Sequence, residues 1–296
     1  MIDQLISTFC RIDDFCIIYH KELQSKSIGY KKKKVGVKPR LSLSEIMTIL
    51  IMYQAVRYKD FKTYYVEFIK IYWKQYFPTA PSYNRFVELI DIAMSPLITF
   101  ISSNHGKHTD LYFIDATKLP VCNNLRESRH KVFKGLAAKG KTSTGWFFGF
   151  KLHLLTNHIG EIVSINISPG NKDDRSFLTR LCHGLKELVF GDRGYISKDK
   201  AQLLEQQGLK LITTLKKNMK KVPRTRFEKA MLTKRSIIET IFDYLKNNLT
   251  LWHTRHRSIN NAFTHLIAAL AQFIISPIKI NNYKYCLLYT SDAADD

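Results

Sequence analysis

The sequence predicts an α/β domain built on a mixed sheet and preceded by an all-helical region. Before about residue 108, apolar residues recur at helical period. From Leu111 onward, short apolar or alternating runs take over, and they stop at aspartate, glycine or proline. Helical patterns lie between and after these runs, and such a mixture is typical of an α/β domain. We therefore expect a helical region over 1–108 and an α/β domain over 109–285.

The N-terminal region contains four expected helices, over about 1–24, 42–58, 61–76 and 82–103. The second begins at Ser42-Leu-Ser-Glu45, a capping box in which two side chains satisfy the first backbone amides. Pro78 to Pro81 breaks the chain before the fourth helix. The basic run Lys31–Lys34 is either a solvated linker or an arm that contacts phosphate, and its charge alone favours the linker.

The second region contains five expected strands, at 111–114, 147–155, 161–168, 188–191 and 209–215. Helices are expected over about 198–207, 227–248 and 260–275. The strand over 161–168 has the clearest alternation, and Pro169-Gly170 ends it.

The charge balance indicates a polyanionic partner. The formal net charge is +21, from 46 Lys and Arg against 25 Asp and Glu. Nucleic acid is the first candidate and an acidic membrane surface the second. The apolar stretch Ala262–Ile275 is too short and too polar to span a bilayer, so we expect no membrane segment there. Five scattered cysteines and the lack of a signal peptide predict a cytoplasmic protein.

The last residues, Cys286–Asp296, differ in composition from the Lys-, Ile- and Asn-rich chain before them. They resemble a translated sequencing adaptor, and we expect them not to belong to the natural protein.

Two aspartates follow buried strands. Asp115 follows Leu111–Ile114, and Asp192 follows Leu188–Gly191. Side chains at the carboxyl ends of neighbouring strands converge in open α/β sheets. Two carboxylates brought together repel unless a cation such as Mg²⁺ compensates them. Either aspartate alone reads more simply as the cap of a turn, and only the pair with a third carboxylate favours a metal site.

The third carboxylate is Glu239, on an amphipathic helix. Arg235, Glu239 and Lys246 are spaced by four and seven, so they line up beside the apolar stripe of that helix. The simpler interpretation is a surface ion pair between Arg235 and Glu239. Asp243 lies near the same face and is a competing ligand.

Three blocks carry a family resemblance: Phe113-Ile-Asp115-Ala-Thr, Gly191-Asp192-Arg-Gly-Tyr195 and Arg235-x-x-x-Glu239 with Lys246. In this order and spacing they resemble the catalytic blocks of bacterial insertion-sequence DDE transposases. The Gly149–His153 and Trp252–Ser258 stretches further resemble the nine-eight-two insertion-sequence branch.

The resemblance implies an RNase H-like catalytic core that cuts element ends and joins them to target DNA. Asp115, Asp192 and Glu239 would be catalytic and would hold two Mg²⁺ ions, with Mn²⁺ able to substitute. Arg235 and Lys246 would contact DNA phosphates. Related transposases carry a tyrosine three residues before the arginine, and Leu232 stands there in this chain.

Further DNA contacts are expected from Lys151 and His153, which alternate on one strand, and from Arg255 and Arg257. From the residues alone, the first pair reads as surface-facing strand positions and the second as part of a polar connection. The expected partner is double-stranded DNA, as terminal inverted repeats and target, bound by a homodimer.

Two other functions share some of these features. A metal-dependent nuclease or resolvase on the same fold would have the same triad without strand joining. A DNA-binding protein without chemistry would share the charge but would not need aligned carboxylates.

Overall fold

The computed structural model describes residues 1–26, 40–56, 58, 60–143, 145–215, 218–219, 222–249, 251 and 256–276. The chain divides into two units, which we take in turn. A helical unit comprises Met1–Asn104, Leu245–Leu251 and His256–Ile275, and His105–Tyr244 form most of an α/β unit. The sequence predicts DNA binding for residues 1–108 and catalysis for residues 109–285, and this division of function stays a prediction.

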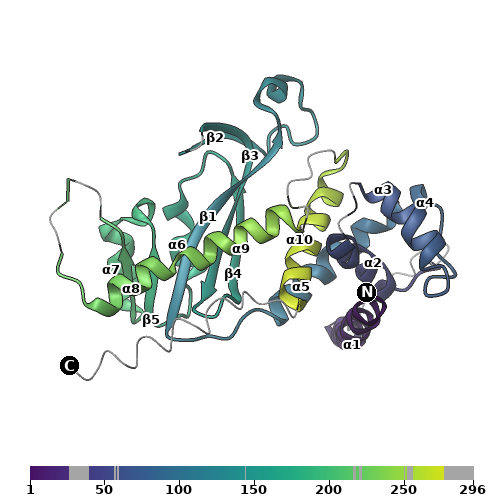
Figure 1. Ribbon diagram of the computed structural model, residues 1–296, viewed down its shortest axis with the longest axis horizontal. Coiled ribbons are helices and arrows are strands. Elements are labelled where there is room, and N and C mark those ends of the chain that lie inside the picture. Colours follow the sequence, from purple (N-terminus) through teal and green to yellow (C-terminus); the bar gives the residue numbers. More distant parts are fainter. Residues whose placement is uncertain are drawn as a thin grey trace. The chain divides into compact units, whose positions relative to one another are not determined.

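The helical unit contains α1 (Ile2–Lys26), α2 (Leu43–Val56), α3 (Phe61–Thr63), the π-helical η1 (Tyr64–Tyr72), α4 (Tyr83–Leu89), η2 (Ile90–Ala93), α5 (Met94–Ser103) and α10 (Ile259–Ile275) (Figure 1). The predicted capping box is present before α2. The Ser42 amide donates to Glu45 at 2.6 Å, and the Glu45 amide donates to the Ser42 hydroxyl at 3.1 Å.

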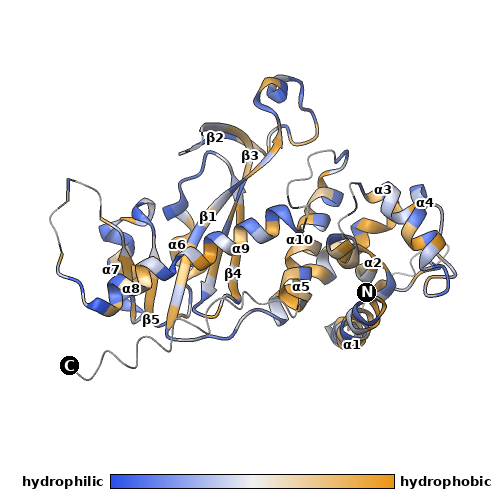
Figure 2. Cartoon of the chain, viewed as in Figure 1, coloured by the Kyte–Doolittle hydropathy of each residue, from blue (hydrophilic) through white to orange (hydrophobic). Residues whose placement is uncertain are grey.

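Helix α2 forms the centre of this unit, because Ser44 and all residues from Ile46 to Gln54 are buried. One stretch, Tyr83–Ser103, is long and apolar enough to cross a membrane by length and composition. Its side chains Phe86, Leu97 and Phe100 are fully buried in the same core, so we interpret it as a core helix. In Figure 2, α5 and α10 are both coloured mainly as hydrophobic, as expected for helices of one core.

The α/β unit is built on β1 (Leu111–Cys122), β2 (Ala138–Thr142), β3 (Gly145–Asn157), β4 (Ile162–Pro169), β5 (Glu187–Gly191) and β6 (Leu209–Thr213). In the described part of the chain these strands form one mixed sheet, in the order β2-β3-β1-β5-β6, with β4 also on β3. Strands β1, β3 and β4 pair antiparallel, whereas β1, β5 and β6 pair parallel.

Strand β1 differs from the prediction, because it continues to Cys122 instead of ending at Ile114. Its pairing with β5 ends at Phe113, opposite Phe190, while its pairing with β3 runs on. Asp115 therefore lies inside β1, but just beyond the end of the parallel β1–β5 pair. Strand β2 was not expected from the sequence, since only its pairing with β3 distinguishes it from a loop.

Short helices η3 (Asn124–Arg129), η4 (Asp174–Phe177), α6 (Leu178–Leu181), η5 (Arg193–Tyr195) and α7 (Lys198–Gln206) connect the strands, and α8 (Arg226–Lys234) and α9 (Ser236–Asn247) follow them. The single helix expected over 227–248 is divided at Arg235, which caps α8. Helix α9 alternates between hydrophobic and hydrophilic residues in Figure 2, as the sequence predicted for an amphipathic helix.

Three stretches singled out in the sequence lie outside the described residues: Lys31–Lys34, Trp252–Arg255 and Cys286–Asp296. The predicted role of Arg255 therefore stays a prediction.

Candidate active site

A cavity of about 710 Å³ opens at the carboxyl end of the parallel β1–β5 pair. The three predicted ligands, Asp115, Asp192 and Glu239, all line it. They come from β1, from the residue that follows β5, and from α9. The predicted convergence of these three side chains on one crevice is therefore present in the structure.

Local backbone geometry holds both aspartates. Asp115 accepts a hydrogen bond of 2.8 Å from the amide of Ala116. Asp192 caps η5 and accepts 2.7 Å from the amide of Gly194. A side chain at position 194 would collide with the Asp192 carboxylate, since a Cβ there would lie 2.8 Å from its Oδ1. The Gly191-Asp192-Arg-Gly-Tyr195 block thus fixes the Asp192 carboxylate at the carboxyl end of β5.

Arg235 links the other two carboxylates. Its guanidinium donates 2.9 Å to Asp115 and 2.9 Å to Glu239. The Glu239 pair is the i,i+4 ion pair that the helical spacing predicted, but Arg235 also reaches across to β1. The arginine and Asp115 are largely covered, whereas the Glu239 side chain is 57% exposed.

The surroundings of Asp115 change the pKa of its carboxyl. Burial raises the pKa of its carboxyl to about 6, although the Ala116 amide and Arg235 act to lower it. The negative charges of Asp192 and Glu239 raise that pKa further. Burial is the largest of these causes, and the two neighbouring carboxylates add to it.

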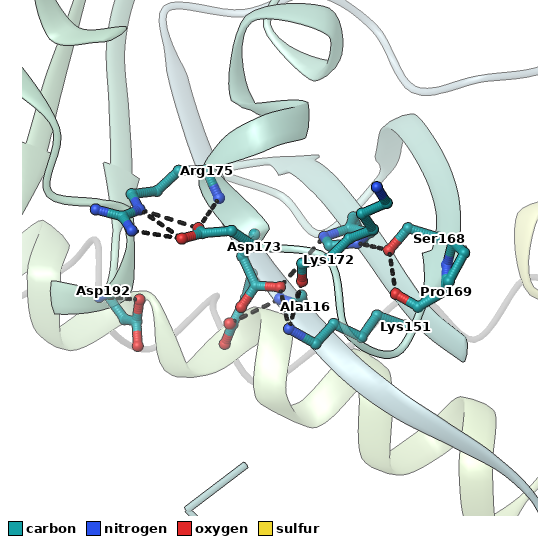
Figure 3. A network of polar contacts seen from close by, with 12 residues as sticks. Ala116, Lys151, Ser168, Pro169, Lys172, Asp173, Arg175 and Asp192 are labelled. Atoms are coloured by element: carbon teal, nitrogen blue, oxygen red, sulfur yellow. Dashed lines mark hydrogen bonds and ion pairs between the residues drawn. The ribbon is translucent and has the colours of Figure 1, made fainter. Parts of the chain in front are cut away.

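A second set of polar contacts includes other residues that line the cavity (Figure 3). Lys151 donates 2.9 Å to the Asp174 carboxylate and 2.9 Å to the carbonyl of Lys172. Arg175 forms hydrogen bonds with Asp173, which lower the pKa of that carboxyl to about 2. With only 12% of its side chain exposed, Lys151 lines the cavity rather than the outer surface of the strand.

His153 differs from both readings of the sequence. Its side chain is fully buried, so it neither faces the surface nor lies where DNA could contact it. Its Nε2 is 2.8 Å from the Ser168 hydroxyl, and its ring packs on Phe177 with 4.8 Å between centroids. Burial lowers the pKa of His153 to about 4, opposed by the nearby Asp174 carboxylate. The β3–β4 pairing and the packing of η4 cover this residue, which the alternation of β3 alone did not reveal.

Two further predicted contacts, Lys246 and Arg257, are not among the residues that line the cavity. Lys246 is half-buried near the end of α9, and Arg257 is exposed just before α10. Asp243, the competing ligand, does not line the cavity either, so Glu239 is the carboxylate that α9 contributes.

Several cavity residues were missed in the sequence. Lys118, Lys141, Arg193 and the segment Asp173–Arg175 all line the cavity. The segment directly follows the turn at Pro169-Gly170, and Arg193 lies inside a block that the sequence already highlighted. Arg193 and this segment were recognisable as following predicted strands, whereas Lys118 and Lys141 lie inside β1 and β2. The proximity of all of them to Asp115 depends on the sheet order.

The donor set fits a divalent cation, although among the described residues no group of three His, Cys, Asp or Glu side chains is arranged to hold a metal ion directly. Three carboxylates with excess negative charge are the hard oxygen donors that Mg²⁺ and Mn²⁺ accept. Arg235 donates hydrogen bonds to two of them, and mutual repulsion opposes closer approach of all three.

Comparison with known proteins agrees with this arrangement. Residues 105–259, more than half of the chain, match the family model described as a transposase DDE domain. Among solved structures, the cryo-EM structure of the piggyBac transposase synaptic complex with hairpin DNA is similar, with a TM-score of 0.50 and 12% sequence identity. The match covers 84% of this chain and 69% of that one, and at this identity it shows the fold alone. No curated protein matches this chain. The predicted RNase H-like mixed-sheet fold is confirmed.

Proposed function

The chain belongs to the DDE transposase family, and we propose that its DNA transposition activity depends on Asp115, Asp192 and Glu239 as the ligands of a divalent metal pair. The observation that carries this proposal is the cavity itself. Carboxylates from three separate elements line it together with Arg235 and Lys151. Membership of the nine-eight-two branch stays a prediction.

We infer that the ions are two Mg²⁺, with Mn²⁺ able to substitute, because the donors are all carboxylate oxygens. When bound, such a pair would activate a hydroxyl nucleophile and stabilise the leaving oxygen of a phosphodiester. We propose Asp115 as the ligand that both ions would share. It lies on the central strand β1, and the charges of both other carboxylates raise its pKa.

The chain's own cations would hold the DNA. Arg235 has a planar guanidinium that can release the carboxylates and bind a phosphate through two parallel hydrogen bonds. Lys151 is held in place by Asp174, so its ammonium group faces the cavity at little entropic cost. We propose further phosphate contacts by Lys246, Arg255 and Arg257.

His153 has a different role in this proposal. Because it is buried behind Lys151 and contacts the Ser168 hydroxyl, we assign it to positioning the Asp174–Lys151 pair. Its Nδ1 lies 3.9 Å from the Asp174 carboxylate.

The proposed substrate is double-stranded DNA, as terminal inverted repeats of an element and as target, held by a homodimer in the cytoplasm. The helical region over 1–108 would contribute DNA binding. The net charge of +21 supports a polyanionic partner. The piggyBac transposase, whose fold is similar, is described in a synaptic complex with hairpin DNA.

The test is a strand-transfer assay with purified protein, Mg²⁺, labelled element ends and a plasmid target. Joined products support transposition. Cleavage without joining would indicate a nuclease or resolvase on the same fold, and binding without either reaction would indicate a DNA-binding protein without chemistry.

A further inference from the structure

An exposed tryptophan stands on the hairpin beside the cavity. Trp146 is the second residue of β3, and 54% of its side chain is exposed. Several large apolar residues in the described part of the chain are exposed, and Trp146 differs from them in its place on the hairpin whose residues Lys141–Ser143 line the cavity. The family function above does not require it.

The hairpin holds this ring in a defined place. Trp146 pairs with Lys141 across the β2–β3 ladder. The turn is closed by Gly145, whose φ of +110° lies in the region that favours glycine. Asn124 Nδ2 donates 2.8 Å to the Trp146 carbonyl, which ties the strand to η3. Strand pairing and the Asn124 hydrogen bond therefore hold the backbone of Trp146 in place.

Two ammonium groups lie over the ring. Lys139 Nζ lies 5.7 Å and Lys141 Nζ 5.5 Å from its centroid. Residues 139, 141 and 146 share one face of the hairpin, because alternate strand residues point the same way. The opposite face is closed, since a Cβ on Gly140 would lie 2.3 Å from the Gly170 carbonyl oxygen. The exposed ring and both ammonium groups therefore share the open face of the hairpin.

This face adjoins the candidate active site. Lys141, Thr142 and Ser143, which precede Trp146 in the hairpin, line the same cavity as Asp115 and Asp192. A DNA strand whose phosphate lay in the cavity would pass the hairpin within a few nucleotides.

We propose that Trp146 is a stacking platform for an unpaired DNA base next to the scissile phosphate, and that Lys139 and Lys141 bind the phosphates on either side of that base. Aromatic rings interleaved with lysines are the recurring means of binding single-stranded DNA, because every base has a stacking face. This inference rests on the proposed function and adds that the substrate is opened at the cleavage site.

Duplex DNA fits this surface less well. In a paired helix the base faces are covered by their neighbours, so a protruding indole meets only edges and backbone.

The two lysines are not equivalent. Lys139 forms an ion pair with Glu127 at 3.6 Å, whereas Lys141 lines the cavity. Lys141 is therefore the better placed of the two for a phosphate near the scissile bond.

The experiment measures binding without cleavage. Full-length protein is titrated, in EDTA, onto a fluorescently labelled forked DNA unpaired at one end and onto the same sequence fully paired. Trp146→Ala is expected to weaken binding to the fork by about tenfold or more, the scale of losing one stacked base. Binding to the paired DNA should change by less than about twofold, and Trp146→Phe should retain most of the fork affinity because it keeps a ring.

Leu125→Ala is the matched control, since Leu125 is an exposed apolar residue of the neighbouring η3, 90% exposed. It should bind both probes as the unchanged chain does. Equal losses on both probes would show that Trp146 contacts duplex, and no loss on either would show that it only stabilises the hairpin; each result overturns the inference. Because cleavage is not measured here, failure of the strand-transfer assay alone would overturn the proposed function and leave this result standing.

Discussion

Arg235 donates a hydrogen bond of 2.9 Å to Asp115, which lies 120 positions earlier in the chain. The same guanidinium donates 2.9 Å to Glu239, so one cation compensates two of the three carboxylates in the cavity. Arg235 lies at the junction of α8 and α9, where the helical backbone is interrupted. Arg235 therefore lies just before the first regular turn of α9, and it still makes the i,i+4 contact to Glu239.

Replacing any one of the three carboxylates should abolish strand cleavage and leave DNA binding nearly unchanged. Asp115→Asn, Asp192→Asn and Glu239→Gln keep the shape and remove the charge that binds metal. Because loss of an outer-shell metal partner alone typically costs about 10- to 100-fold, we expect a loss above about a hundredfold. The measurements are cleavage of labelled ends and a binding titration.

Asp243→Asn is the control for that series, since Asp243 is on the same helix but outside the cavity. It should cleave at the rate of the unchanged chain. A loss of cleavage in Asp243→Asn, with normal activity in Glu239→Gln, would transfer the ligand role to Asp243.

Removing Arg235 should destabilise the metal-free protein. Arg235→Gln leaves Asp115 and Glu239 without their shared partner, which should lower the free energy of unfolding by about 1–3 kcal/mol in EDTA. Added Mg²⁺ should then recover more stability in the variant than in the unchanged chain, because the ion meets less competition. Thermal melts with and without Mg²⁺ measure both effects. If Arg235→Gln melts as the unchanged chain does in EDTA, the bridge contributes nothing.

His153 should make stability depend on pH in mildly acid solution. Its folded pKa of about 4 lies below its ordinary value of 6.5, so the unfolded chain binds the proton first as pH falls. The stability that His153 contributes is full above about pH 6.5 and is lost between about pH 6.5 and 4, by on the order of 1–3 kcal/mol. Asp115 acts in the opposite direction between about pH 6 and 4, because its folded pKa of about 6 lies above its ordinary value of 3.8.

The check is chemical denaturation across that pH range. His153→Gln should lose less stability than the unchanged chain as pH falls through this range, and His183→Gln, at an exposed position, should behave as the unchanged chain does. A curve that keeps its slope in His153→Gln would assign the dependence to other groups.

Ending the chain at Tyr285 should change neither melting temperature nor cleavage. Cys286–Asp296 reads as translated adaptor and lies outside the described residues, and a segment of that origin has no evolved packing surface. A thermal melt and a cleavage assay of the shortened chain beside the full chain measure this. A clear fall in either would show that the segment belongs to the folded protein.

Local signals in the sequence were sufficient for several parts of the site. The apolar run Leu188–Gly191 and the glycine at 194 place Asp192 at a strand end, whatever the rest of the chain does. The amphipathic spacing of α9 and the pairing of Arg235 with Glu239 follow from helical periodicity alone. The Ser42–Glu45 capping box is equally local, and it too is present.

Other parts depended on strand pairing between distant segments. Asp115 was expected at the end of its strand, but β3 continues the pairing to Cys122. Lys151 and His153 have the same alternation in sequence, yet one lines the cavity and the other is buried under η4. Alternation assigns a residue to a face of a strand, but what covers that face is decided by which strands and loops pack there. The sequence by itself therefore determined which carboxylates were candidates for one site, and only the tertiary structure decided what surrounds them.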